Sequence, residues 1–242
     1  MEFIIISMII ALGGFVQGLT GFGLALVSVP LLSLFIDVKL AIPIAGIFGW
    51  FVTFPIVYKM RHYVNWKIGL ILFVGSLPGS YLGADLLKHL PTDIILITMG
   101  IILILSGLYS FRSKNTLFKS VSKPISLGVG FFSGALGASV GEPGPPVIAY
   151  TSMLPWSNHE TKSTLVFFFM LQMIGAITGF WLKELLTSDV LWHVGKAIPA
   201  FLLGTFLGMF SYNLLNRYQL NYHKIIYTFL IFIGFVLIIK NF

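Results

Sequence analysis

The chain has 242 residues, of which 57% are hydrophobic and only 10% are charged, and its formal net charge is +7. A soluble domain averages about 25% charged residues. A water-soluble fold of this size could not cover so many helices that are apolar all round, so lipid must surround most of the surface. The composition therefore predicts an integral membrane protein. No Cys is present, which excludes disulfides and thiolate metal sites.

Long apolar runs follow one another along the chain, and short polar segments separate them. The basic residues lie mainly in those segments, where they orient a membrane protein by the positive-inside rule. Because the chain has no separate basic domain, nucleic-acid binding is not predicted. The runs lie at roughly 3–36, 40–58, 66–87, 93–111, 124–155, 163–182, 190–215 and 222–239.

The second half of the chain repeats features of the first. The segment 17–23 (QGLTGFG) is echoed by 133–139 (SGALGAS), which places Gly134 116 positions after Gly18. Leu77-Pro78 with Gly83 is echoed by Ile198-Pro199 with Gly204 at an offset of 121. Several matches in order, at a nearly constant offset, predict a duplicated unit of four runs. We expect a first transmembrane repeat over residues 1–115 and a second over residues 116–242.

The runs at 3–36 and 124–155 are too long for one crossing, which needs about 20 residues, and too short for two crossings with a turn. Closely spaced glycines interrupt each run near its middle. One geometry is a single crossing that is unwound at the glycines, which gives parallel repeats. The other is a re-entrant hairpin, which leaves three spanning helices per half and gives inverted repeats. Both place most loop Lys and Arg on the cytoplasmic side, and the hairpin geometry does so by the wider margin. The favoured fold is an all-α integral membrane protein of two homologous four-run halves. We expect inverted repeats, each with a broken or re-entrant glycine-rich helix and three spanning helices.

The two glycine-rich turns are the candidate substrate sites. Glycine permits positive φ, so backbone N–H groups can converge on a ligand, and the N-terminus of a half-helix attracts anions. Neutral hydroxyl and amide donors would bind an anion and still release it. The alternative is close helix packing through small residues. The candidate substrate-binding residues are Gln17, Gly18, Thr20, Gly21, Phe22 and Gly23 in the first turn, and Ser133, Gly137, Ser139, Gly141 and Glu142 in the second.

Glu142, Lys196 and Gln172 have more than one interpretation each. Glu142 is an acidic residue well inside an apolar run, which indicates either proton coupling during transport or a cap for the helix that starts at the following prolines. Lys196 could offer charge to an anion or pair with Glu142, or it could snorkel to the membrane interface beside Trp192. Gln172 could contact the substrate or form a hydrogen bond between helices.

The duplicated turn resembles that of a known transporter family. The segment 13–23 (GGFVQGLTGFG), which leads to Val29-Pro30-Leu31-Leu32, is similar to the first signature of the TauE/SafE family of sulfite and organosulfonate exporters. The second copy, residues 128–150, is a looser match, since Ala138-Ser139 stand where the family often has paired glycines. The resemblance extends over essentially the whole chain.

The resemblance implies a secondary transporter of a small anion such as sulfite, an organosulfonate or a related sulfur-containing acid. Alternating access would operate around the two glycine-rich breaks at mid-membrane. An anion channel and a non-transporting membrane assembly module are the alternatives. No enzyme activity, cofactor or metal is expected. The expected surroundings are the lipid bilayer of a bacterial or archaeal plasma membrane, with a homo-oligomer as a possible state.

Overall fold

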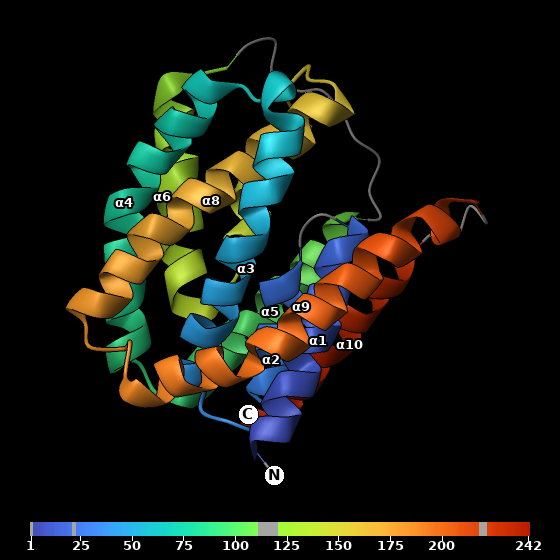
Figure 1. The fold of residues 1–242 in the computed structure, drawn as a ribbon. Helices are drawn as coiled ribbons and strands as arrows, with labels where there is room; N and C mark the ends of the chain where they lie inside the picture. The colour runs from blue at the N-terminus through green and yellow to red at the C-terminus, as the bar shows by residue number, and fades with distance from the viewer. Residues whose placement is uncertain (1, 21–22, 111–120, 218–221) are drawn as a thin grey trace. The chain divides into compact units, whose positions relative to one another are not determined.

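The structure is a computed structural model that describes residues 2–20, 23–110, 121–217 and 222–242. Within these residues the chain forms ten α-helices, one 3₁₀ turn and no strand, which confirms the all-helical prediction (Figure 1). The helices are α1 Glu2–Thr20, α2 Leu24–Leu32, α3 Val38–Met60, α4 Trp66–His89, α5 Thr92–Ser110, α6 Lys123–Val140, α7 Gly144–Ser152, α8 Asn158–Leu182, α9 Ser188–Arg217 and α10 Tyr222–Asn241, and the 3₁₀ turn is Arg61–Tyr63.

Six helices in the described part of the chain are long and apolar enough to cross a membrane. At 1.5 Å of rise per residue, each spans most or all of a hydrocarbon core about 30 Å thick. The protein is therefore a multi-pass membrane protein. The candidate spans are Glu2–Leu19, Val38–Tyr63, Trp66–His89, Thr92–Tyr109, Asn158–Leu182 and Ser188–Ser211, and a shorter apolar helix covers Thr228–Asn241.

The helices form two compact units. The first unit consists of Met1–Gly49, Leu90–Arg112 and Leu185–Phe242, and the second consists of Trp50–His89 and Ser113–Glu184. Each unit therefore contains helices from both halves of the sequence. The compact units therefore do not coincide with the predicted repeats, 1–115 and 116–242, which divide the chain by sequence.

Both over-long runs fold as helical hairpins. In the first unit, the Leu24 N–H donates to the Gln17 side chain, and the Ser28 hydroxyl donates to the Ile9 carbonyl, so α2 runs back along α1. In the second unit, Ser133 bonds to the Pro143 carbonyl, and the Ser126 hydroxyl lies 2.9 Å from that of Tyr150. These contacts make α7 antiparallel to α6. In both runs the chain therefore turns back on itself, as in the predicted hairpin, and the inverted arrangement of the repeats stays a prediction.

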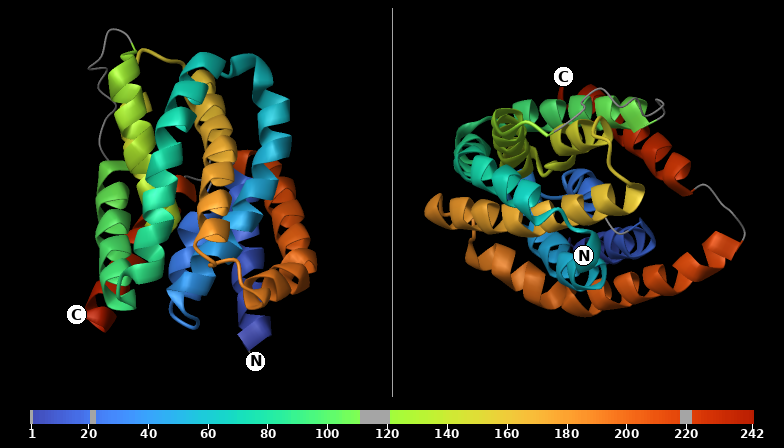
Figure 2. Two further views of the ribbon diagram at one scale, coloured as in Figure 1. Left: turned by 90° about the vertical axis from the view of Figure 1, so that its left-hand side faces the viewer. Right: turned by 90° about the horizontal axis from the view of Figure 1, so that it is seen from above.

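In the second unit, α4 and α6 approach so closely that only glycine fits at the contact (Figures 1 and 2). A Cβ at Gly75 or Gly79 of α4 would collide with a carbonyl of α6, and one at Gly130 or Gly134 would collide with a carbonyl of α4. Close backbone approach through small residues is the usual basis of helix association in lipid. Helix α8 packs on the same pair, where a Cβ at Gly179 would lie 3.0 Å from the Ala84 Cβ.

In the first unit, α1 and α9 repeat this arrangement. A Cβ at Gly204 or Gly208 of α9 would collide with the carbonyl of Ala11 or Phe15. In return, a Cβ at Gly14 would lie 3.1 Å from the Phe201 carbonyl oxygen of α9. Helices α5 and α10 meet at Gly100 and Gly234, and a Cβ on either would lie 2.7 Å from the other's carbonyl oxygen. Each unit thus packs a hairpin helix of one half against a long helix of the other half.

The α4–α6 contact and the α1–α9 contact bring equivalent residues together. Leu72 faces Gly130 in the second unit, and Phe201 faces Gly14 in the first. Gly130 lies 116 positions after Gly14, as the sequence repeat predicts, whereas Phe201 lies 129 positions after Leu72. By these contacts, a residue of α9 occupies the same packing position as the α4 residue 129 places earlier in the sequence. The offset of 121 that relates Pro78 to Pro199 in the sequence does not relate their positions in the packing.

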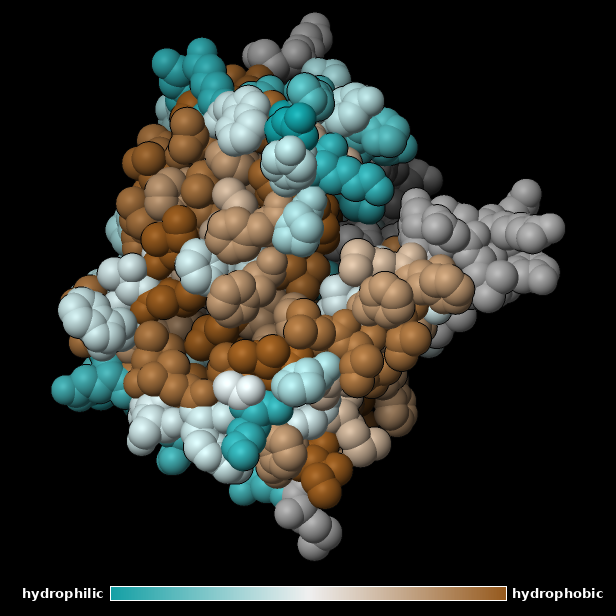
Figure 3. Space-filling model, viewed as in Figure 1, coloured by the Kyte–Doolittle hydropathy of each residue, from teal (hydrophilic) through white to brown (hydrophobic). Residues whose placement is uncertain are grey.

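The surface over α4 and α8 is apolar along the helices, and hydrophilic side chains gather toward the helix ends (Figure 3). Leu70, Val74 and Leu77 of α4 are among the exposed apolar side chains. A membrane-embedded surface has this pattern because lipid tails replace water as the solvent.

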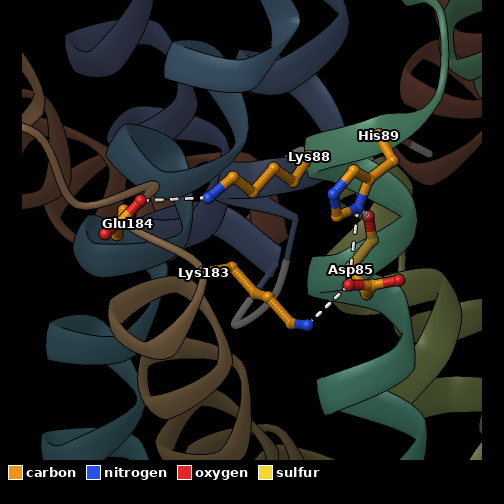
Figure 4. A network of polar contacts seen from close by, with 5 residues as sticks. All are labelled: Asp85, Lys88, His89, Lys183 and Glu184. Atoms are coloured by element: carbon orange, nitrogen blue, oxygen red, sulfur yellow. Dashed lines mark hydrogen bonds and ion pairs between the residues drawn. The ribbon is translucent and has the colours of Figure 1, made fainter.

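An ion-pair cluster joins the C-terminal ends of α4 and α8 (Figure 4). Lys183 Nζ lies 2.5 Å from an Asp85 carboxylate oxygen, and Lys88 Nζ lies 3.1 Å from a Glu184 carboxylate oxygen. The hydrogen bond to Asp85 raises the pKa of Lys183, so this ammonium stays charged at neutral pH. Glu184 has φ 58°, the one positive value among the described non-glycine residues. The cluster therefore lies at the left-handed turn that follows α8.

Candidate anion-binding helix breaks

The break between α6 and α7 places a buried carboxyl group inside the second unit. Gly141 ends α6 with φ 78°, in the left-handed region, and its N–H bonds back to the Leu136 carbonyl. The chain then turns so that Glu142 is only 1% exposed, and its Oε1 atom has no hydrogen-bond partner. Helix α7 has Pro143 as its N-cap and no side-chain cap hydrogen bond. The capping interpretation of Glu142 therefore finds no support in the geometry.

Two polar side chains from other helices lie beside this break. Gln172 of α8 is fully buried, and its Nε2 donates to the Ser80 hydroxyl of α4 at 3.3 Å. A Cβ on Gly137 would lie 2.8 Å from Gln172 Nε2 and 2.9 Å from the Pro143 Cβ. Gln172 therefore forms the predicted hydrogen bond between helices and also lies against the break. Its Oε1 atom is buried without a partner, as is the Glu142 oxygen.

The donors at this break differ from those that the sequence suggested. The Ser133 hydroxyl donates to the Pro143 carbonyl, and the Ser139 hydroxyl donates to the Ala135 carbonyl at 2.7 Å. These hydroxyls brace the turn in this structure. Because Pro143, Pro145 and Pro146 carry no N–H, Gly144 is the residue at the start of α7 whose amide can donate to a ligand. The Gln172 amide and the Ser80 hydroxyl complete the set of neutral polar groups.

The break between α1 and α2 offers more backbone donors. Gly23 has φ 110° at the start of α2, a conformation that glycine adopts without strain. Gln17 is 4% exposed, and its Oε1 accepts from the Leu24 N–H at 3.0 Å. Gln17 therefore caps α2, which was not its predicted role. The Ala25 and Leu26 amides follow in the first helical turn, where N–H groups have no acceptor within the helix.

Some predicted residues of the first turn lie outside the described part of the chain: Gly21, Phe22 and the side chain of Thr20. Gly18 lies within it, and a Cβ there would be 2.6 Å from the Thr205 carbonyl oxygen of α9. The packing role therefore applies to Gly18. The same helix contact places the Thr205 side chain against Gly14, one turn earlier on α1.

Sequence reasoning missed Ser80 and Thr205. Ser80 bonds to Gln172, and Thr205 Oγ1 is buried without a hydrogen-bond partner, 2.8 Å from a Cβ built on Gly14. Both lie on the glycine-rich helices that pack against the hairpins. Their signal was the spacing of small residues along α4 and α9, which marks the face that meets a neighbouring helix. Lys196 of α9 is exposed, with its Nζ 5.6 Å from the Trp192 ring centroid, as snorkelling predicts.

Comparison with known proteins identifies the family. No curated protein and no solved structure matched the chain. The family model described as sulfite exporter TauE/SafE matches residues 6–237, which include both helix breaks and the whole of α2 to α9. The chain therefore belongs to the TauE/SafE sulfite exporter family, a family of membrane transporters.

Proposed function

We propose that this protein is a secondary transporter of a small oxyanion, with sulfite, an organosulfonate or a related sulfur-containing acid as the substrate class. Membership of the TauE/SafE family supports this class. In the proposed mechanism the protein works by alternating access in the plasma membrane, and each helix break supplies groups that bind the anion. Neither break has a Lys or Arg, so the anion is held by neutral donors and can be released.

The observation that supports this proposal best is the buried carboxyl group of Glu142 in the α6–α7 break. An ionised carboxylate at 1% exposure, with one oxygen unpaired, is costly inside a protein. An incoming anion would add repulsion to that cost. Protonation removes both penalties and turns the group into a hydrogen-bond donor. In the proposed cycle, Glu142 therefore takes up a proton as the anion binds and releases it when the anion leaves.

The polar groups around Glu142 suit an oxyanion with several acceptor atoms. The Gly144 N–H, the Gln172 amide and the Ser80 hydroxyl come from α7, α8 and α4. Ser133 and Gly137 support the site from α6, since Ser133 braces the turn and Gly137 leaves room for Gln172. In the other unit, the Ala25 and Leu26 amides at the start of α2 supply the donors, and Gln17 holds that helix end in place.

The function is tested by flux in proteoliposomes that contain the purified chain. We expect sulfite or a small sulfonate to enter with saturation and to drive counterflow of labelled substrate, because a carrier must return its site across the membrane. Unsaturated flux without counterflow would indicate an anion channel. No flux for any sulfur oxyanion, and no stabilisation of the protein by them, would indicate a non-transporting module.

The role of Glu142 is tested with Glu142→Gln, which keeps the size and removes the titrating proton. We expect proton-driven uptake to fall by tenfold or more, while counterflow at equal pH on both sides persists and loses its pH dependence. Glu2→Gln is the matched control, since Glu2 is an exposed carboxylate in the first turn of α1. If Glu142→Gln transports like the wild type at every pH, the coupling proposal is wrong.

A further inference from the structure

An open groove runs between α1 and α9 in the first unit, with a volume of about 660 Å³. Its floor consists of small residues, among them Ala11, Ala200 and Gly204, and the two helices lie in close contact at Ala11 and Gly204. Its walls are apolar side chains that are largely exposed, such as Met8 at 67% and Leu203 at 64%. In a membrane this groove opens toward lipid, and its volume is within the range of small-molecule sites.

One end of the groove is polar and cationic. Among the described residues, Lys196 is the one charged side chain that lines it. Ser7 lines it opposite, with a buried hydroxyl that has no hydrogen-bond partner in the described part of the chain. Both residues lie one helical turn beyond a ring contact between Phe3 and Trp192, whose ring centroids are 6.1 Å apart. Aromatic residues of this kind concentrate at the headgroup level of a bilayer, as do snorkelling lysines.

The length of the groove matches one leaflet. From Ser7 to Phe15 on α1, and from Lys196 to Leu207 on α9, the rise is about 12 to 17 Å. Half of a hydrocarbon core is about 15 Å thick. A chain that lies in the groove, with its polar end at Lys196, would therefore reach from the headgroup region to about the middle of the bilayer.

We propose that this groove binds an anionic phospholipid, with one acyl chain between α1 and α9 and the phosphate paired with Lys196. The charge of the polar end selects the lipid, because none of the described residues that line the groove is acidic and could offset the ammonium group. Basic pockets between membrane helices bind anionic headgroups in this way. Since α1 also carries the first helix break, a bound lipid stabilises the helix on which that break depends.

The test uses the full-length chain in an uncharged detergent, with phosphatidylglycerol and phosphatidylcholine that have the same acyl chains. Native mass spectrometry measures the lipid retained, and thermal unfolding measures the stabilisation that binding produces. We expect one tightly retained phosphatidylglycerol per chain and a larger rise in melting temperature than with phosphatidylcholine. Equal retention and equal stabilisation by the two lipids would overturn the proposal.

Lys196→Gln should reduce the affinity for phosphatidylglycerol about fivefold, the factor expected for one lysine at a membrane surface, and leave phosphatidylcholine unaffected. Lys67→Gln is the matched control, because Lys67 is an exposed lysine in the first turn of α4. In the second unit, α4 occupies the place that α9 has in the first. Lys196→Arg keeps the charge and should keep the preference. If both glutamine variants lose affinity equally, the attraction is general and the site at Lys196 is refuted.

The acyl-chain part of the proposal is tested by Ala200→Phe, which fills the floor of the groove. We expect this variant to release the retained lipid while it still folds, since Ala200 lies in the open groove. If the Phe side chain in Ala200→Phe prevents folding, Lys196→Gln still tests the lipid site through the affinity for phosphatidylglycerol. If Ala200→Phe instead dissociates a dimer and lipid retention is unchanged, the occupant is a second copy of the chain and the proposal fails.

Discussion

At the scale of single residues, two buried glutamines have different roles. Gln17 Oε1 accepts the Leu24 N–H at 3.0 Å and so closes the first hairpin. Gln172 Oε1 is buried without a partner, while its Nε2 donates weakly to Ser80 at 3.3 Å. A buried polar group that makes its hydrogen bonds within the protein stabilises the fold. A buried group that is left partly unsatisfied is available to a ligand.

We therefore expect Gln17→Met and Gln172→Met to have opposite profiles. Gln17→Met leaves the Leu24 N–H without its acceptor and should lower the free energy of unfolding by about 1–3 kcal/mol. Gln172→Met should cost less than about 1.5 kcal/mol, because it removes one long hydrogen bond, yet it should reduce substrate affinity or flux by tenfold or more. Unfolding in detergent and uptake in proteoliposomes measure the two effects. A larger stability loss for Gln172→Met than for Gln17→Met would contradict this assignment.

At the scale of elements, the sequence predicted the helices better than the contacts between them. The apolar runs agree closely with the helix bounds, and the two left-handed glycines, Gly23 and Gly141, fall inside the predicted breaks. Hydrophobic length and glycine spacing are local signals, so one sequence is enough to recognise them. The roles of Ser80 and Thr205 depend on which helix faces each hairpin. Local periodicity contains no information about that pairing.

The same limit explains the differences at the candidate sites. Ser133 and Ser139 were predicted to bind an anion, but their hydroxyls donate to the Pro143 and Ala135 carbonyls. A serine in a glycine-rich turn can bond to either a ligand or its own backbone, and residue type does not distinguish the two. The burial of Glu142 was predicted correctly, because its neighbours in the sequence are apolar. The missing cap hydrogen bond became visible only in the three-dimensional structure.

The tight contact between α4 and α6 leads to a prediction for two glycines of the same helix. A Cβ on Gly130 would collide with the Leu72 carbonyl of α4, whereas a Cβ on Gly128 would meet nothing within 4 Å. Gly130→Ala should therefore lower the free energy of unfolding by about 1–3 kcal/mol, as overpacking does. Gly128→Ala should raise it by up to about 1 kcal/mol, because alanine favours the helix. Unfolding of both variants in one detergent provides the comparison, and equal effects would show that the backbones are not in this contact.

At the scale of the whole molecule, each compact unit joins helices from both halves of the sequence. Helix α1 packs on α9, α6 packs on α4, and α5 packs on α10. Every long helix of the first half that makes these contacts thus has its partner in the second half. The glycines at the contacts have no side chain to cover another surface, so such a helix without its partner exposes its backbone. The two halves therefore exchange partners, and neither half contains both helices of any of these three contacts.

This exchange predicts the behaviour of a chain cut between the proposed repeats. Fragments 1–115 and 116–242, expressed separately, should insert into the membrane but remain protease-sensitive and inactive, because α1, α4 and α5 lack α9, α6 and α10. Expressed together, they should copurify and recover transport, since the contacts form between helices that are already inserted. The Gly130→Ala substitution in the second fragment should weaken copurification, and Gly128→Ala should not. A fragment that resists protease alone would show that one half folds without the other, and the exchanged packing would then be wrong.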